Sequence, residues 1–246
     1  MWWFSTYCMC VLTYLPLQCE GFIVTHSRDE HSARPKAMPP RQYLLQQQSV
    51  IYPKDTQAGG TWIATSQEFT LCLLNGAFEN HQHSPPYRQS RGLVILDFFE
   101  YNSVFDFVQL YDFKGIEPFT LIVIDAAGKY ELSEIRWDAH DVTLTIKDNR
   151  LPHIWSSATL YPLEVRQERE HWFADWFLNN PDFEAEDILN FHLNGGTGDA
   201  HNDMKMNRNG QLLTQCITQI QRGTNHRYTI TYQDLLSDEQ KRYCVF

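Results

Sequence analysis

The sequence predicts an α+β fold with antiparallel sheets for this chain of 246 residues. Segments typical of strands and segments typical of helices form separate blocks, without the strict alternation of a parallel sheet. Apolar residues make up 43% of the chain and charged residues 20%, a composition that supports a buried core and excludes an intrinsically disordered chain. This length allows one large domain or two small ones, and the lack of a linker or repeat in the sequence favours one.

Strands dominate the first third of the chain. A hairpin-like break at residues 18–21 separates the first two strands, and the Gly59-Gly60 turn precedes another pair. A proline-rich connection with Pro35, Pro39 and Pro40 lies between these pairs. The expected strands, rich in β-branched and aromatic residues, are 11–17, 22–26, 50–52, 61–65 and 69–74.

Helices are expected in two places. Residues 91–111 predict two helices with a break near Asn102-Ser103, where Ser103 caps the second. Residues 163–178 predict an amphipathic helix with Val165, Trp172, Phe173, Trp176 and Phe177 towards one side, and residues 184–193 predict a shorter helix. Around them we expect strands at 119–125, 129–137, 142–147, 212–220 and 228–232, and a polar, glycine-rich loop at 194–209.

Charge and hydropathy exclude several classes of protein. With 20 basic and 30 acidic residues the net charge is −10, which predicts no nucleic-acid partner and no anionic membrane surface. No stretch reaches the roughly 18 apolar residues of a membrane-spanning helix. The first residues lack the basic region and cleavage site of a secretory signal. We therefore expect a cytoplasmic protein without an integral membrane segment.

Metal and cofactor sites have little support in the sequence. The six cysteines include no C-x-x-C pair, so neither a zinc site nor a disulfide framework is expected. His81, His83 and His201 have the residue type of metal ligands but no helical spacing that would orient them, and we interpret them as loop residues. The glycines of 195–198 are not followed by the lysine of a phosphate-binding loop. We predict no metal and no cofactor.

The dipeptide Met9-Cys10 directly before the first strand is the most informative feature. If translation starts at Met9 and this residue is removed, Cys10 carries both a thiol and a free α-amine. The ordinary pKa of an α-amine is near 7.7–8.0, which suits it to accept the thiol proton at neutral pH.

Arg28 and Asp29 lie at the end of the second strand. A hairpin would return both to the start of the first strand, where Arg28 favours a thiolate and Asp29 orients the ammonium. The spacing alone leaves a second interpretation open, because an Arg-Asp dipeptide at a strand end is commonly a surface ion pair.

Five segments together resemble the NRDE family, also called transport and Golgi organisation 2. They are Met9-Cys10, Ser27-Arg28-Asp29-Glu30 followed by Ala33-Arg34-Pro35, Ala58-Gly59-Gly60-Thr61-Trp62, Leu74-Asn75 and the segment from Ile154 to Tyr161, the last of which is most similar to bacterial members. The likeness runs from Cys10 to about Tyr161. The family is in turn similar to cysteine-type N-terminal nucleophile hydrolases that cleave linear amides, such as bile-salt hydrolases and penicillin V acylases. This resemblance implies a four-layer αββα sandwich.

The resemblance also implies roles for individual residues. Cys10 matches the nucleophile, Arg28 and Asp29 match the charged pair that attends it, and Asn75 matches the asparagine that donates to the oxyanion. Trp62 and Ser157 are expected to bind the substrate.

Three features depart from the family pattern. Ser27 stands where the family motif has asparagine, and Ser157 stands near the second active-site asparagine of the hydrolases. Residues 1–9 precede Cys10, and we interpret them as a miscalled start or a propeptide ahead of a single domain at 10–246.

Two functions follow from the resemblance. The first is a cysteine N-terminal nucleophile hydrolase that acts on a linear amide (C–N) bond of a small molecule. The alternative is a non-catalytic protein that binds or moves haem or an acyl lipid in the same cleft, since family relatives are associated with haem trafficking and lipid metabolism. The sequence identifies neither the substrate nor the oligomeric state.

Overall fold

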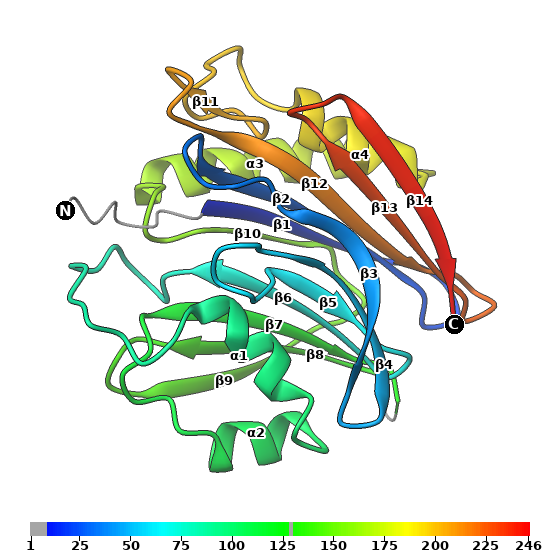
Figure 1. The fold of residues 1–246 in the computed structure, drawn as a ribbon. Helices are drawn as coiled ribbons and strands as arrows, with labels where there is room; N and C mark the ends of the chain where they lie inside the picture. The colour runs from blue at the N-terminus through cyan, green and yellow to red at the C-terminus, as the bar shows by residue number, and fades with distance from the viewer. Residues whose placement is uncertain (1–8, 128–129) are drawn as a thin grey trace. The chain divides into compact units, whose positions relative to one another are not determined.

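The computed structural model describes residues 9–127 and 130–246, which form two compact units. We call residues 9–34 and 150–246 the terminal unit, and residues 35–149 the central unit. Each unit contains one antiparallel sheet and its own helices (Figure 1). The α+β class with antiparallel sheets is therefore confirmed. The single domain expected at 10–246 stays a prediction, and of the extra segment 1–9, residues 1–8 lie outside the described residues.

The sheet of the terminal unit has the strand order β10-β1-β2-β12-β13-β14, with β11 paired to β12. Helices α3 (Leu163–Asn179) and α4 (Ala185–Asn194) belong to the same unit. The strands are β1 (Met9–Pro16), β2 (Phe22–His31), β10 (His153–Ser156), β11 (Asn207–Arg208), β12 (Leu212–Arg222), β13 (Tyr228–Asp234) and β14 (Glu239–Val245).

Side-chain alternation along β1 gives this sheet two different faces. Val11 and Leu15 pack with Phe173 of α3 and Phe191 of α4 in one apolar cluster, and both helices lie along that side of the sheet (Figure 1). The expected amphipathic helix is confirmed, since Phe173 is buried and the other four predicted residues pack around it. Because successive strand residues point to opposite faces, Cys10 and Leu12 face away from these helices.

The sheet of the central unit follows the order β3-β4-β5-β6-β7-β8-β9. Helices α1 (Arg91–Phe98) and α2 (Val104–Leu110) pack on it through a large aromatic cluster that includes Phe98, Phe107 and Phe119. The strands are β3 (Met38–Leu45), β4 (Gln48–Lys54), β5 (Ile63–Thr65), β6 (Phe69–Asn75), β7 (Phe119–Asp125), β8 (Glu131–Trp137) and β9 (Val142–Lys147).

Several local predictions are confirmed. The first two strands form the expected hairpin, closed by a hydrogen bond from the Leu17 N–H to the Gly21 carbonyl at 2.8 Å. The Ser103 hydroxyl accepts from the Asp106 N–H at 3.0 Å, so Ser103 caps α2 as predicted.

The proline-rich connection is the clearest error of the sequence prediction. Pro39 and Pro40 lie inside strand β3, which is the edge strand of its sheet. An edge strand tolerates residues without an N–H, because one side of it makes no ladder bonds. The pairing of β3 with β4 shifts register between Met38 and Arg41, which is where the two prolines lie. Strands β10, β11 and β14 were also not predicted.

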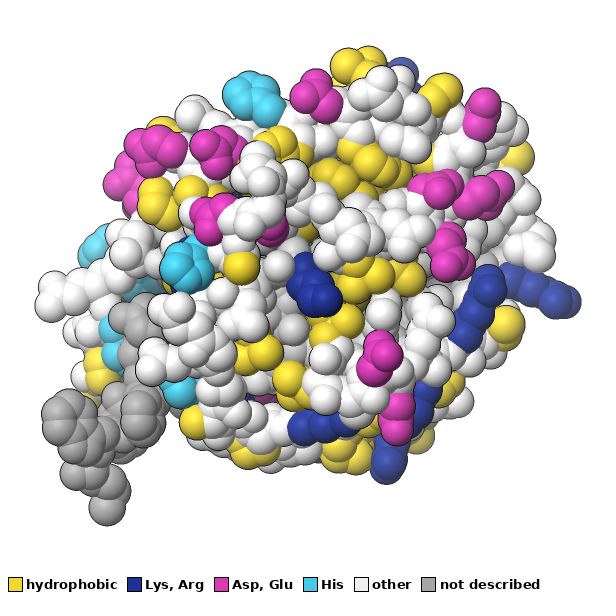
Figure 2. Space-filling model, turned by 90° about the horizontal axis from the view of Figure 1, so that it is seen from above, with side chains coloured by type: hydrophobic (Ala, Val, Ile, Leu, Met, Phe, Trp, Pro, Cys, Tyr) yellow, Lys and Arg dark blue, Asp and Glu magenta, His cyan; other side chains and the backbone are white. Residues whose placement is uncertain are grey.

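Acidic side chains (magenta) lie at several separate places on the surface shown in Figure 2, in keeping with the net charge of −10. Within the part of the chain that the structure describes, no helix is both long and apolar enough to cross a membrane.

Candidate active site

Cys10 lies near the start of β1, next to the central strand β2. Its partner across the ladder is Arg28, and the preceding residue, Met9, pairs with Asp29. The Cys10 side chain is 2% exposed. The predicted return of Arg28 and Asp29 to the start of the first strand is therefore confirmed, and the β1–β2 hairpin produces it.

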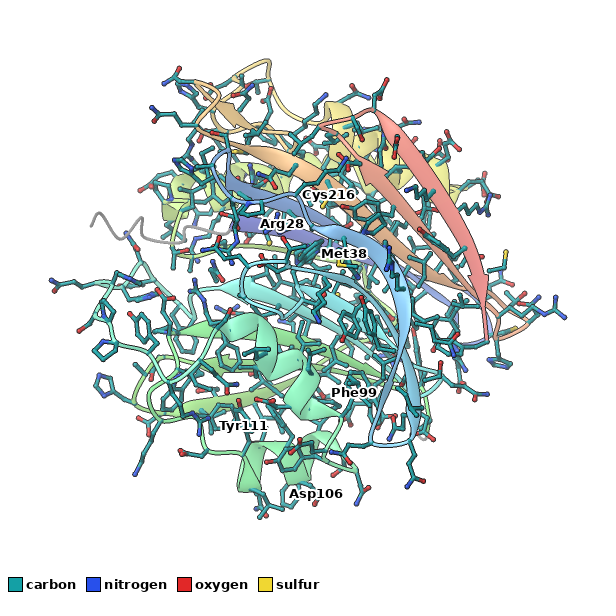
Figure 3. All side chains as sticks on the ribbon, viewed as in Figure 1. Arg28, Met38, Phe99, Asp106, Tyr111 and Cys216 are labelled. Carbon is teal, nitrogen blue, oxygen red and sulfur yellow. The ribbon has the colours of Figure 1, made fainter. Side chains whose placement is uncertain are left out.

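Arg28 is a buried cation held by two groups. Its Nη1 donates to Oε1 of Gln215 at 2.8 Å, and its Nη2 donates to Oε2 of Glu30 at 3.2 Å. The Arg34 guanidinium adds a second cation 3.4 Å from the same Glu30 oxygen. A positive charge fixed beside a cysteine favours the thiolate form. On the other side of Arg28, Cys216 of β12 is its ladder partner, and Figure 3 shows these two residues on neighbouring strands.

Asp29 points to the opposite face of the sheet from Arg28. Thr214 Oγ1 donates to its Oδ1 at 2.5 Å, and the Tyr161 hydroxyl donates to its Oδ2 at 2.9 Å. The side chain is 0% exposed, and this burial raises its pKa from 3.8 to about 6, against the lowering effects of Arg169 and the two hydroxyl donors. The surface ion pair considered from the sequence is therefore wrong: Arg28 and Asp29 are both buried and have different partners.

Ser27, the departure from the family motif, faces the helices together with Asp29. Its hydroxyl lies 2.8 Å from Nδ1 of His192 on α4, and the Thr13 hydroxyl lies 2.8 Å from the other ring nitrogen. Burial lowers the pKa of His192 to about 3, so the ring is neutral. Ser27 thus connects α4 to the helix-facing side of the sheet. Cys10 and Arg28 lie on the opposite side.

Ser157 lies directly beside Cys10. Its backbone N–H donates to the Cys10 carbonyl at 3.0 Å, just beyond the end of β10. Its hydroxyl lies 3.0 Å from that of Thr159, and the residue is 0% exposed. The structure therefore brings together three predicted residues by backbone pairing, namely Cys10, Arg28 and Ser157.

Asn75 and Trp62 belong to the central unit. Asn75 is the last residue of β6 and is 4% exposed. It precedes Gly76, which has a φ of 82° and whose N–H donates to the Pro118 carbonyl at 3.0 Å. Trp62 is also 4% exposed, and its carbonyl accepts from the N–H of Leu73 at 2.9 Å.

The Gly59-Gly60 segment before Trp62 has a structural role. A Cβ on Gly60 would lie 2.4 Å from the carbonyl carbon of Gly92 in helix α1, so only glycine permits this approach. The Thr61 N–H donates to the Gly92 carbonyl at 3.0 Å. This contact fixes the start of α1 against the turn that carries Trp62.

The sequence does not indicate all the residues that surround Asp29 and Arg28. Thr214 and Gln215 come from β12, far along the chain, and no local pattern connects them to the start of β1. Tyr161 and Glu30 lie within the segments that carry the family resemblance, so the resemblance is the feature of the sequence that could have indicated them.

Two of the three histidines considered as metal ligands, His81 and His83, contact a carboxylate instead. His81 Nε2 and His83 Nδ1 lie 3.1 and 3.0 Å from the same carboxylate oxygen of Glu117, and Arg91 pairs with its other oxygen at 3.0 Å. Among the described residues no group of three or more His, Cys, Asp or Glu side chains is arranged to hold a metal ion.

Comparison with solved structures shows the fold. Penicillin V acylase from Agrobacterium tumefaciens is 10% identical, with a TM-score of 0.53 over 96% of this chain and 86% of that chain. A variant of conjugated bile acid hydrolase from Clostridium perfringens is also 10% identical, with a TM-score of 0.53 over 96% of this chain and 97% of that chain. At this identity the likeness concerns the fold alone, and it confirms that the chain has the fold of these two enzymes, as expected.

No curated protein matches the chain. The family model for Transport and Golgi organisation 2 matches residues 8–241, which extends well beyond the segments that first suggested it and includes β12 and β13. Because this match covers nearly the whole chain and includes Cys10, Arg28 and Asp29, the chain belongs to the Transport and Golgi organisation 2 family.

Proposed function

We propose that this protein is a cysteine-type N-terminal nucleophile hydrolase that cleaves a linear amide bond of a small molecule. The observation that carries the proposal is the ladder pair Cys10–Arg28, which sets a buried thiol beside a buried, anchored guanidinium. A thiol in an apolar setting is inert, whereas a thiol beside a fixed cation is a nucleophile. Two similar structures are named as an acylase and a hydrolase, which fits this class of reaction.

The reaction follows from the groups at the start of β1. The Cys10 sulfur attacks the amide carbonyl, and its α-amine accepts the thiol proton. The amine then protonates the leaving nitrogen, the C–N bond breaks, and an acyl thioester remains on Cys10. Water attacks this thioester, the amine takes a proton from the water, and the acid leaves as the thiol forms again.

Other residues support these steps in the proposal. Arg28 stabilises the thiolate, and Asp29 accepts a hydrogen bond from the ammonium. Asn75 donates to the oxyanion of each tetrahedral intermediate. Trp62 and Ser157 bind the substrate.

The test uses protein that begins at Cys10, as checked by intact mass, and a panel of N-acyl 4-nitroanilides. We expect a burst of nitroaniline equal to the amount of enzyme, and an acyl adduct on the Cys10 peptide. Cys10→Ala should lose both. Cys216→Ala is the matched control, because Cys216 is equally buried and flanks Arg28 on the other side, and it should retain both.

Two results would contradict the proposal. One is equal turnover by the Cys10→Ala protein. The other is stoichiometric binding of haem or an acyl lipid, unaffected by Cys10→Ala and without cleavage of any amide, which would favour the binding protein.

A further inference from the structure

Asp29 is surrounded by buried groups on the helix-facing side of the terminal sheet. Tyr161 and Thr214 each donate to one of its carboxylate oxygens, at 2.9 and 2.5 Å. Tyr161 follows β10 and Thr214 lies on β12, so the two donors reach the carboxylate from different parts of the chain. Both are buried, at 1% and 3% exposure.

A fixed cation lies over the ring of Tyr161. The guanidinium of Arg169, on α3, lies 3.7 Å from the ring centroid and is 0% exposed. Its Nε and Nη2 donate to the backbone carbonyls of Asn202 and Asp203 at 3.1 and 2.8 Å, which holds it in place. Arg208 lies 5.6 Å from the same ring. A cation over an aromatic ring is attracted more strongly when both groups are desolvated.

We propose that Tyr161 is a positioning residue for Asp29. Its hydroxyl, backed by the Arg169 guanidinium on its ring, keeps the Asp29 carboxylate ionised and fixed beside the start of β1, where Met9 pairs with Asp29. This inference rests on the proposed function, in which that carboxylate serves the α-amine of Cys10.

Burial and the neighbouring groups shift the pKa of Asp29 in opposite directions. Burial raises its pKa to about 6, while Arg169, Thr214, Tyr161 and Arg208 lower it. On α4, which packs on the same face of the sheet, His192 is neutral and lies within hydrogen-bond distance of Ser27 and Thr13. Loss of the Tyr161 hydroxyl therefore raises the pH at which Asp29 loses its proton.

The experiment measures alkylation of Cys10 by iodoacetamide from pH 5 to 8, in protein that begins at Cys10. In the unchanged protein the rate should fall on the acid side near pH 6, as Asp29 becomes protonated. Tyr161→Phe retains the ring beneath Arg169 but removes the hydroxyl. It should shift the pH of this decrease in rate upward by about one unit, because losing a hydrogen bond to a charged group changes a pKa by about that amount. At pH 6 the variant should then react about fivefold more slowly. Thr214→Val removes the other donor and should shift the profile in the same direction.

Tyr111→Phe is the matched control. The Tyr111 hydroxyl also donates to an aspartate, Asp97, at 2.8 Å, but in the central unit, where Figure 3 labels Tyr111. Its loss should leave the alkylation profile unchanged.

Asp29→Asn separates the inference from the proposed function. Suppose that Asp29→Asn abolishes the decrease of the alkylation rate at low pH, while Tyr161→Phe leaves that decrease at its original pH. The positioning role of Tyr161 is then wrong, and the role of Asp29 stands. If Asp29→Asn leaves the profile unchanged, the role of Asp29 at the Cys10 amine is wrong, and the inference falls with it. A folded Thr214→Val protein with a shifted profile supports the inference even where Tyr161→Phe unfolds.

Discussion

The backbone N–H of Ser157 donates to the carbonyl of Cys10 at 3.0 Å. Strand β1 thus has Arg28 as the partner of Cys10 on one side and Ser157 beside Cys10 on the other. The backbone of Cys10 is therefore paired on both sides, and a change of side chain does not disturb this pairing.

The first prediction concerns the start of the chain. Only a terminal Cys10 has a free α-amine, so protein that begins at Cys10 should cleave amides. Protein that retains residues 1–9 should fold but remain inactive, because its Cys10 nitrogen is an amide. Intact mass and turnover of the same sample test this. Full activity in a sample whose mass includes residues 1–9 would exclude the proposed proton transfer.

The second prediction concerns Asp29 and pH. Its raised pKa means that between about pH 4 and pH 6 the folded state binds more protons than the unfolded state, so this residue lowers stability as pH rises. Above pH 6 the full cost is roughly 3 kcal/mol. Between pH 4 and pH 7, Asp29→Asn should therefore gain about 2 kcal/mol of unfolding free energy relative to the unchanged protein, because part of the cost is already present at pH 4. Urea unfolding at both pH values measures this, and an equal difference at pH 4 and pH 7 would contradict it.

The third prediction concerns His192, which acts in the opposite direction. Its lowered pKa means that the unfolded state binds the additional proton, so its contribution to stability is present above about pH 6.5 and is lost as pH falls towards 3. His192→Gln should flatten this acid-side loss. The same urea series detects the change, and a slope identical to that of the unchanged protein would show that His192 does not titrate on unfolding in this range.

The fourth prediction concerns Asn75. An oxyanion donor acts on charge that exists only near the transition state, so Asn75→Ala should lower turnover by about 10²–10³, or roughly 3–4 kcal/mol, with substrate binding retained. The following turn should survive, because Gly76 is held by Pro118 and by the Thr120 hydroxyl at 2.9 Å. Turnover, binding and melting are measured on one preparation. A large loss of melting temperature with normal turnover would assign Asn75 to the turn alone.

The fifth prediction concerns Gly60. Because its Cβ would meet the Gly92 backbone at 2.4 Å, Gly60→Ala should lower stability by about 3 kcal/mol. Gly59→Ala is the matched control. Gly59 has a φ of +78° and open space around it, so the change should cost only about 1–2 kcal/mol, from backbone strain. Equal losses for both variants would contradict the close approach.

The elements that depend on local pattern could be predicted from the order of residues. The content of β-branched and aromatic residues and the break at residues 18–21 predicted the β1–β2 hairpin. The Ser103 cap followed from a residue type that accepts backbone hydrogen bonds at helix starts. The family segments supplied Cys10, Arg28 and Asp29, and the hairpin was sufficient to place the two charged residues at the start of β1. The prolines of β3 misled the prediction, because local propensity does not show whether a strand lies at an edge.

The groups that surround these residues depend on how distant strands and helices pack. Thr214 and Gln215 reach Asp29 and Arg28 because β12 pairs with β2, and Arg169 reaches Tyr161 because α3 packs on that face. Strand pairing over such separations depends on burial of whole faces and not on local preference. For the same reason the sequence did not exclude a surface ion pair between Arg28 and Asp29. Their burial and the separation of their side chains onto opposite faces are properties of the assembled sheet.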